Sequence, residues 1–206
     1  MTFFITHRGI SIVAAVALAI GVLAFSTVSF QGQAATTEED LAGTVARLEG
    51  SAIAMQDAVP RILEVDSPVY IGDVLSTGPD SRLEIKMIDD GIFTLSESRT
   101  FMVIDYTFGG GNPNGLLRLM SGAVNAASGQ LAKAAGAQFT MGADSATIGI
   151  RGTEFWAGDL DGVFQVGLWS GAVVVENRGG AVEINRPNYG TRVADQDTSP
   201  LAPQPW

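Results

Sequence analysis

The stretch ATIGIRGTEF, Ala146–Phe155, carries the side chain with the most directed chemistry in this sequence. Arg151 lies between Gly149 and Gly152 in a run that is otherwise rich in β-branched residues. A guanidinium binds carboxylates or backbone carbonyls through a planar fork of donors, and glycine inside a strand pattern marks a bulge or a close backbone approach. The spacing therefore predicts an arginine that is held at an irregular point of a strand.

Two roles for Arg151 stay open. In the favoured role the guanidinium is half-buried, pairs with an acid and locks a strand crossing, because an arginine between glycines in an apolar run suits an internal tie. In the other role it is an exposed anchor for the carboxylate of a partner. The acids considered for the tie are Glu154, Asp73 and Glu84, and the candidate binding residues of this region are Thr147, Gly149, Arg151, Gly152, Thr153, Glu154, Trp156 and Trp169.

The residue types that most catalytic sites need are missing. The chain has no cysteine, and its single histidine, His7, lies in the N-terminal segment. Ser-His-Asp and Cys-His catalysis and ordinary zinc sites therefore have no residues to use. We expect a protein that is not an enzyme and that has neither a metal nor another cofactor.

Three weaker patterns have plainer explanations. The 22 carboxylates could supply a pair for glycoside hydrolysis, but they fall mostly in turns or on polar strand faces. The run from Asp159 to Gly162 begins like a calcium loop but lacks the later glutamate, which favours a turn. Trp156 and Trp169 could stack on sugars or lie with one edge buried in the fold. A carboxylate-based hydrolase is therefore the least favoured function, and glycan binding stays an alternative.

Short strands separated by glycine dominate the chain after Glu38. Arg82–Met87 alternates between apolar and polar residues, and Ile92–Leu95 returns after an Asp-Asp-Gly turn. Asp-Gly between alternating runs indicates a hairpin, because glycine accepts the positive φ that such turns need, and Asp161-Gly162 is a second example. We expect a meander over Val163–Ile184, and the best helix candidate is only the short run Gln130–Ala135.

A small unit recurs in this layout. Three segments share the pattern apolar, polar, glycine, small, and then apolar or small: LEGSA (48–52), MSGAV (120–124) and WSGAV (169–173). Each predicts a two-residue turn between strands. Their separations follow no fixed period, so the sequence indicates one turn geometry used again and not a regular solenoid.

The two ends differ from the rest of the chain. Residues 1–35 read as a signal peptide, with Arg8 before an apolar core and small residues at the end, or as an uncleaved membrane anchor. Either interpretation places the remainder outside the inner membrane, in the periplasm of a bacterium. Residues 193–206 are polar and rich in proline, which predicts a disordered tail. The formal net charge of −10 argues against nucleic acid as a partner.

ATIGIRGTEF resembles the signature of the FecR domain family, which is named from regulators of iron-siderophore uptake. Upstream, VYIGDVLSTGPDSRLEIKMIDDGIFTLSESRTFMVIDY (69–106) and LLRLMSGAV (116–124) are similar to further blocks of that family in the same order. The resemblance spans about 43–176. One departure is Ala143-Asp144, which stand where the family often has Thr-Pro.

The resemblance implies an all-β extracytoplasmic domain that senses or binds other proteins. In the iron regulators, a cytoplasmic segment ahead of a membrane helix controls a sigma factor. This sequence has only about eight residues there, too few for a folded regulator. It therefore looks like a stand-alone FecR-like domain protein without the cytoplasmic anti-sigma segment.

We thus expect one all-β domain over 36–192, a β-sandwich or a short β-roll of glycine-punctuated strands. Its expected function is protein binding or signalling in the cell envelope, with an envelope or outer-membrane protein as partner, recognised by a sheet edge that accepts a strand. Peptidoglycan is the alternative partner. The membrane would be contacted only through an uncleaved N-terminal segment.

Overall fold

The computed structural model describes residues 40–109 and 112–206, and the predicted signal peptide or anchor lies outside them. This part of the chain is nearly all strand, which confirms the all-β prediction. A short 3₁₀ helix, η2 (Leu131–Lys133), lies within the predicted helix candidate. The strands are β1 (Leu41–Glu49), β2 (Ala52–Gln56), β3 (Val59–Ile62), β4 (Pro68–Tyr70), β5 (Val74–Thr77), β6 (Arg82–Met87), β7 (Ile92–Leu95), β8 (Thr100–Thr107), β9 (Asn114–Ser121), β10 (Ala123–Ala127), β11 (Gln138–Gly142), β12 (Thr147–Leu160), β13 (Val163–Asn177), β14 (Gly180–Ile184), β15 (Tyr189–Val193) and β16 (Gln204–Pro205).

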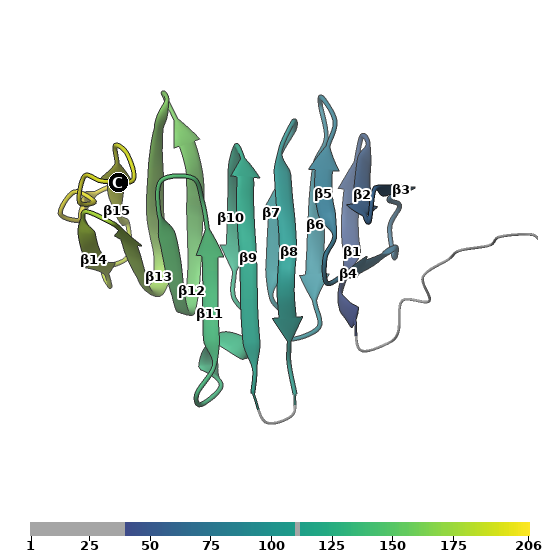
Figure 1. Cartoon of the computed structure of the whole chain (residues 1–206), viewed down its shortest axis with the longest axis horizontal. Coiled ribbons are helices and arrows are strands. Elements are labelled where there is room, and N and C mark those ends of the chain that lie inside the picture. The colour runs from purple at the N-terminus through teal and green to yellow at the C-terminus, as the bar shows by residue number, and fades with distance from the viewer. Residues whose placement is uncertain (1–39, 110–111) are drawn as a thin grey trace, which may run out of the picture. The chain divides into compact units, whose positions relative to one another are not determined.

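The strands form one sheet that curls back on itself into two layers (Figure 1). The first layer has the order β3-β2-β5-β8-β9-β11, and the second has the order β4-β1-β6-β7-β10. Strand β12 joins them, because its first half pairs with β11 and its second half with β10. The inner faces pack on each other: Phe93 of β7 lies 5.7 Å from Phe101 of β8 and 6.4 Å from Phe139 of β11, between ring centroids.

The recurring glycine unit marks points where the chain passes from one layer to the other. Gly50 lies between β1 and β2, and Gly122 between β9 and β10, with φ of 74° and 82°. Both are turns between strands, as predicted. Gly171, with φ of 82°, is instead inside the continuous strand β13, so the predicted turn at that position is wrong. What the three positions share is a change of layer that needs a positive φ.

The two Asp-Gly hairpins form as predicted, and one of their acids does more than turn the chain. Strands β6 and β7 have the expected bounds. Asp89 is buried beside them, and its carboxylate accepts hydrogen bonds from the hydroxyl of Tyr106 at 2.7 Å and the backbone N–H of Leu131 at 2.8 Å. It therefore joins the β6–β7 turn to β8 and η2. Burial and the neighbouring Asp89 carboxylate raise the pKa of Tyr106 above its ordinary value.

The long hairpin of β12 and β13 contains two compensating bulges. The pairing register shifts by one residue at each of two adjacent places, and the second shift restores the register that precedes the first. One extra residue lies on β12 and one on β13. The pairs that define these shifts are Arg151–Ala172, Glu154–Ser170 and Phe155–Leu168.

The first bulge explains the glycine after Arg151. Ile148 and Ile150 are buried in the first half of β12, whereas Phe155 and Ala157 are buried in the second half, so the parity of the buried side chains changes between them. Gly152, with φ of 62°, supplies the extra residue that makes this change. A strand that leaves one layer for the other can thus keep apolar side chains in the core on both sides of the crossing.

Candidate functional site

The outer surface of the first layer exposes a group of apolar side chains, which Arg118 of β9, the cross-strand partner of Met102, interrupts. Alternation on β2, β5, β8 and β9 places one set of residues outward while their neighbours fill the core. Met55 is opposite Val74, and Val74 is opposite Met102, so the set crosses three strands in one line. We call this surface the apolar face, and its residues are Ile53, Met55, Ile62, Val74, Met102, Leu116 and Met120.

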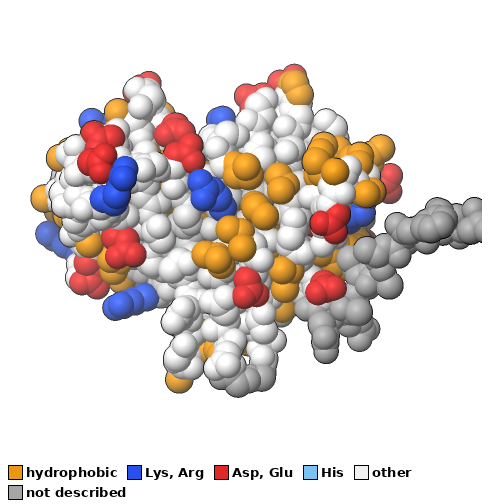
Figure 2. Space-filling model, viewed as in Figure 1, with side chains coloured by type: hydrophobic (Ala, Val, Ile, Leu, Met, Phe, Trp, Pro, Cys, Tyr) orange, Lys and Arg blue, Asp and Glu red, His pale blue; other side chains and the backbone are white. Residues whose placement is uncertain are grey.

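The apolar face is open to solvent. The exposed fraction is 82% for Ile62, 45% for Met120 and 41% for Met55. Figure 2 shows hydrophobic side chains gathered over this region of the surface turned to the viewer. Contiguous apolar surface of this kind marks sites of protein interaction, because leaving it in water is unfavourable.

The outer surface of the second layer is different. A single line of cross-strand pairs runs from Glu84 on β6 through Thr94 on β7 and Asn125 on β10 to Trp156 on β12. Arg82 and Lys86 flank Glu84 on the same side of β6. The two faces thus have the same strand pattern but differ in composition, since the first is mainly apolar with Arg118 as an exception and the second is mainly polar, so the apolar face is not a consequence of the fold alone.

The predicted candidate residues do not meet in one site. Thr147, Gly149 and Arg151 lie on the part of β12 that belongs to the first layer, whereas Glu154 and Trp156 lie beyond the crossing. Trp169 is exposed at the bulge of β13. Thr153 is buried, and its hydroxyl has no hydrogen-bond partner within the described residues. Gly152 shapes the crossing.

The favoured role for Arg151 is wrong. The residue is exposed, and its guanidinium makes no hydrogen bond or ion pair within residues 40–109 and 112–206. The alternation that buries Ile148 and Ile150 places Arg151 on the outer side of β12, just before the bulge, and none of the proposed acids is its partner. The second role, an exposed anchor, is the one that this geometry leaves available.

A different arginine makes the internal tie. Arg61 of β3 donates from Nη2 to Asp73 Oδ2 at 2.5 Å and from Nη1 to the carbonyl of Pro68 at 3.2 Å. Asp73 is fully buried and also accepts the backbone N–H of Tyr70 at 2.8 Å. Because β3 ends one layer and β4 ends the other, this pair fastens the two layers at that end of the sheet. No local pattern around Arg61 indicates this role, since its partner lies in another strand connection.

All three tryptophans of the chain meet on the second layer. The ring centroid of Trp206 lies 5.4 Å from that of Trp156 and 6.4 Å from that of Trp169. Trp156 is half-buried, but it lies on the outer face between the core residues Phe155 and Ala157, and Trp169 remains 37% exposed. The aromatic surface that could have stacked on a sugar is therefore largely used by Trp206.

The prediction of a disordered tail is also wrong, because the tail packs on the body of the domain. Strand β16 pairs with β15, and the backbone N–H of Trp206 donates to the carbonyl of Asn188 at 2.8 Å. The backbone N–H of Leu201 also donates to the backbone carbonyl of Arg192 at 3.0 Å. The composition of the tail lacks apolar residues for a core of its own, but the body of the domain supplies the surface on which it packs.

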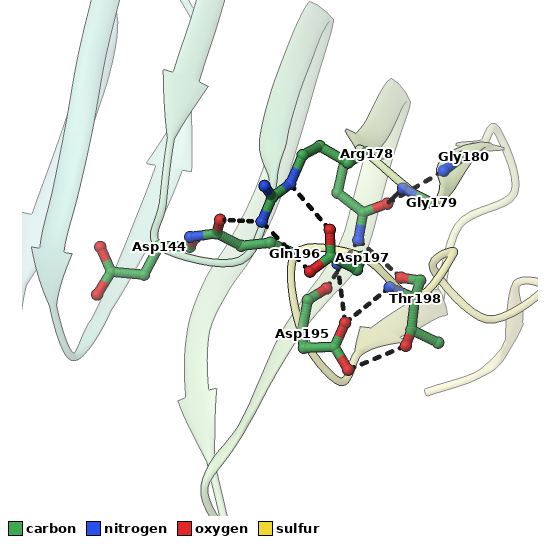
Figure 3. A network of polar contacts seen from close by, with 9 residues as sticks. Asp144, Arg178, Gly179, Gly180, Asp195, Gln196, Asp197 and Thr198 are labelled. Carbon is green, nitrogen blue, oxygen red and sulfur yellow. Dashed lines mark hydrogen bonds and ion pairs between the residues drawn. The ribbon is translucent and has the colours of Figure 1, made fainter.

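Polar contacts fasten the start of the tail to the β13–β14 turn (Figure 3). Arg178 reaches Asp197, with 3.0 Å between Nε and Oδ1, and donates to the side chain of Gln196 at 2.8 Å. Gln196 in turn donates to the backbone carbonyl of Asp144 at 2.7 Å. The tail is therefore tied to the two turns that precede β12 and β14.

Asp195 organises the bend at the start of the tail. Its carboxylate accepts the backbone N–H groups of Asp197 at 2.8 Å and Thr198 at 2.7 Å and the hydroxyl of Thr198 at 2.9 Å. The backbone hydrogen bond from Asp197, followed by that from Thr198, lowers the pKa of Asp195 below its ordinary value of 3.8. The charged carboxylate is thus the form that the bend requires.

We expect this bend to loosen only in strong acid. Because the pKa of Asp195 is lower in the folded state, its contribution is complete above pH 3.8 and is lost as the pH falls through the lower, folded value. The amide NMR signals of Asp197 and Thr198 should shift with a midpoint below 3.8. They should lose this titration in Asp195→Asn, whose side-chain oxygen accepts without a charge. A midpoint at or above 3.8 in the parent chain would contradict the role given to these hydrogen bonds.

Neither a metal cluster nor a membrane-spanning helix is found in the described ranges. No group of three or more His, Cys, Asp or Glu side chains within them could hold a metal ion. Likewise, none of their helices is both long and apolar enough to cross a bilayer.

Comparison with known proteins agrees with this architecture. Residues 73–174 match the family model described as FecR protein. No curated protein matches the chain. Two crystal structures of a candidate anti-sigma factor from Parabacteroides distasonis ATCC 8503 are similar at 15% identity, with TM-scores of 0.51 and 0.52. Each match covers 63% of this chain and 58% of the other, so the chain spans little more than half of that relative, and the likeness shows the fold alone.

Proposed function

The chain carries a FecR domain over residues 73–174, and we propose that it is a non-enzymatic signalling module that binds a protein of the cell envelope through the apolar face. The observation that carries the proposal is the contrast between the two outer surfaces. One layer presents mainly apolar side chains on its outer surface, with Arg118 as a charged exception on β9, whereas the other presents mainly charged, hydroxyl and amide side chains. The apolar face does not contribute to the core, so a partner that covers it explains why its side chains are apolar.

The proposed partner of the apolar face is met by the flat surface of the sheet and not by a strand added at β3 or β4. Strand β3 ends the first layer, but it contains Pro60, which has no N–H to offer to an incoming strand. Strand β4, at the end of the second layer, has three residues and begins with Pro68. These edges suit protection from strand addition better than recognition by it.

Arg151 extends the same surface with a specific polar contact. Pairing places Leu116 opposite Thr140 and Thr140 opposite Gly149, and Arg151 follows Gly149 on the same side of β12. We propose that its free guanidinium binds a carboxylate of the partner, because a bidentate pair of this kind adds direction to an apolar contact. The proposal places the protein outside the inner membrane, as the N-terminal sequence predicts.

Substitutions on the two faces test this function. A photo-crosslinking residue at Leu116 should capture one envelope protein, and the same residue at Asn125 on the opposite face should not. Met55→Glu should weaken the affinity for that protein at least ~10-fold, about 1.4 kcal/mol, because it places a charge in an apolar contact. Asn125→Glu, the matched control, should leave the affinity unchanged.

Arg151→Ala tests whether Arg151 contacts the partner or supports the fold. We expect weaker binding of the captured protein with unfolding free energy within about 0.5 kcal/mol of the parent chain, since an exposed and unpaired side chain contributes little to folding. Equal binding by the parent, Met55→Glu and Arg151→Ala chains would reject the apolar face as the site.

A further inference from the structure

The surface beneath Trp206 is a groove made by missing side chains. Gly167 of β13 is paired with Gly190 of β15, and both are buried although they lie on the outer side of the second layer. The three atoms nearest to a Cβ at Gly167 would all belong to the Trp206 ring, at 2.7–2.8 Å, and a Cβ at Gly190 would overlap the same ring and also come within 2.7 Å of the carbonyl oxygen of Val166. The two adjacent glycines therefore form a floor on which the indole of Trp206 lies.

Two more tryptophans and a strand edge complete the groove. Trp156 and Trp169 stand beside the floor at 5.4 Å and 6.4 Å from Trp206, both with tilted or edge-on rings. The backbone that brings the indole here is a strand of two residues, Gln204–Pro205, on the open edge of β15. Trp206 itself remains 43% exposed. The occupant is thus attached as a bound peptide would be, by short backbone pairing and one aromatic side chain.

We infer that the groove of Gly167, Gly190, Trp156 and Trp169 is a recognition site for an extended segment that carries an aromatic residue, and that Leu201–Trp206 occupies it in cis. A partner segment of the same chemistry would pair with β15 and replace Trp206. The site is separate from the apolar face, because it lies on the outer surface of the other layer. Gly190 and Trp206 also lie outside the range that matches the FecR family.

The cis segment sets the affinity that such a partner must exceed in order to bind. A tethered competitor acts at an effective concentration in the millimolar range, so a free segment of equal affinity binds the parent chain weakly. Removing the indole should open the groove without disturbing the layers, because Trp206 contributes no side chain to the core between them. Trp206→Ala in the full chain is therefore the form in which binding in trans is measurable.

The test is calorimetric titration with the synthetic peptide LAPQPW, which copies Leu201–Trp206. We expect binding to the Trp206→Ala chain and at least ~10-fold weaker binding to the parent chain. The peptide LAPQPA should bind neither. Adding Gly167→Ala to Trp206→Ala should abolish binding, because the new methyl group would lie where the indole ring lies in the parent chain.

Gly167→Ala alone gives an independent measurement in the parent chain. Its methyl group should expel Trp206, which would shift tryptophan emission to longer wavelength while the far-ultraviolet circular dichroism stays that of a β protein. Absence of LAPQPW binding by a folded Trp206→Ala chain would overturn the inference, as would equal binding of LAPQPA or of the Gly167→Ala double variant. Retention of the Trp206→Ala chain on peptidoglycan, competing with the peptide, would assign the groove to glycan instead.

Discussion

Gly171→Ala is expected to destabilise the protein by at least ~3 kcal/mol, whereas Gly152→Ala is expected to cost only about 1–2 kcal/mol. Both glycines have a positive φ, 82° and 62°, so an alanine at either position is strained to a similar degree. The difference lies in what the new methyl group would meet. At Gly171 it would overlap the carbonyl oxygen of Gly152 and come within 2.8 Å of the Cα of Thr153.

The methyl group at Gly152 has space around it. Its nearest neighbour would be the Cγ of Lys133 at 3.8 Å, an ordinary contact with a flexible side chain. At Gly171 the obstacle is backbone, which can give way only if β12 and β13 separate at the crossing. That movement would disturb the compensating bulges and the apolar residues on both sides of them.

Chemical denaturation of the two variants measures this difference. Far-ultraviolet circular dichroism and tryptophan fluorescence should report the same transition, and the loss in unfolding free energy should be clearly larger for Gly171→Ala. Equal losses for the two variants would show that positive φ alone, and not the close approach of the strands, constrains the crossing.

Arg61→Met is the second large expected effect, with a loss of about 3–5 kcal/mol in unfolding free energy. The substitution keeps the apolar stem and removes the charge that faces Asp73. Asp73 is fully buried, and its other oxygen, Oδ1, has no hydrogen-bond partner within the described residues. The carboxylate would therefore remain in the interior without a counter-charge.

Arg47→Met is the matched control. Arg47 pairs with Glu49 at 2.5 Å, but both side chains are more than half exposed, so the loss should be within about 1 kcal/mol. The two arginines thus make ion pairs of equal length in different surroundings.

A second variant separates the charge from the shape of the site. Asp73→Asn keeps an oxygen that accepts the N–H of Tyr70 and removes the charge. Arg61→Met combined with Asp73→Asn should be more stable than Arg61→Met alone, because the uncompensated charge is gone. If the double variant lost as much stability as the sum of the single variants, the ion pair would not be what fastens the two layers.

The local elements were predictable because their signals are local. Alternation in Arg82–Met87 and the Asp-Gly turns specify hairpins through neighbouring residues, and the structure has β6 and β7 with the predicted bounds. Gly152 lies at an irregular point of the backbone, as predicted, since a bulge needs a residue that accepts its φ, whereas Gly149 lies in regularly paired strand. The family blocks, several in the right order, identified the FecR domain.

The errors concern contacts between distant parts of the chain. Arg151 faces outward with the alternation of β12 and makes no ion pair within the part of the chain that the structure describes, which depends on the strands that surround it and not on its neighbours in sequence. The tie between Arg61 and Asp73 joins different strand connections. The tail was expected to be disordered from its own composition, yet its binding surface is provided by Gly167 and Gly190, which have no side chains to reveal it.

The sequence by itself thus determined an all-β FecR domain, its Asp-Gly hairpins and the turns at Gly50 and Gly122, because periodicity, turn chemistry and φ preferences act over a few residues. The tertiary structure decided which arginine is internal, where the three tryptophans meet and which outer surface is apolar. Those properties arise only when strands far apart in the chain become neighbours, since the same alternating pattern can turn its exposed side either to solvent or to a partner.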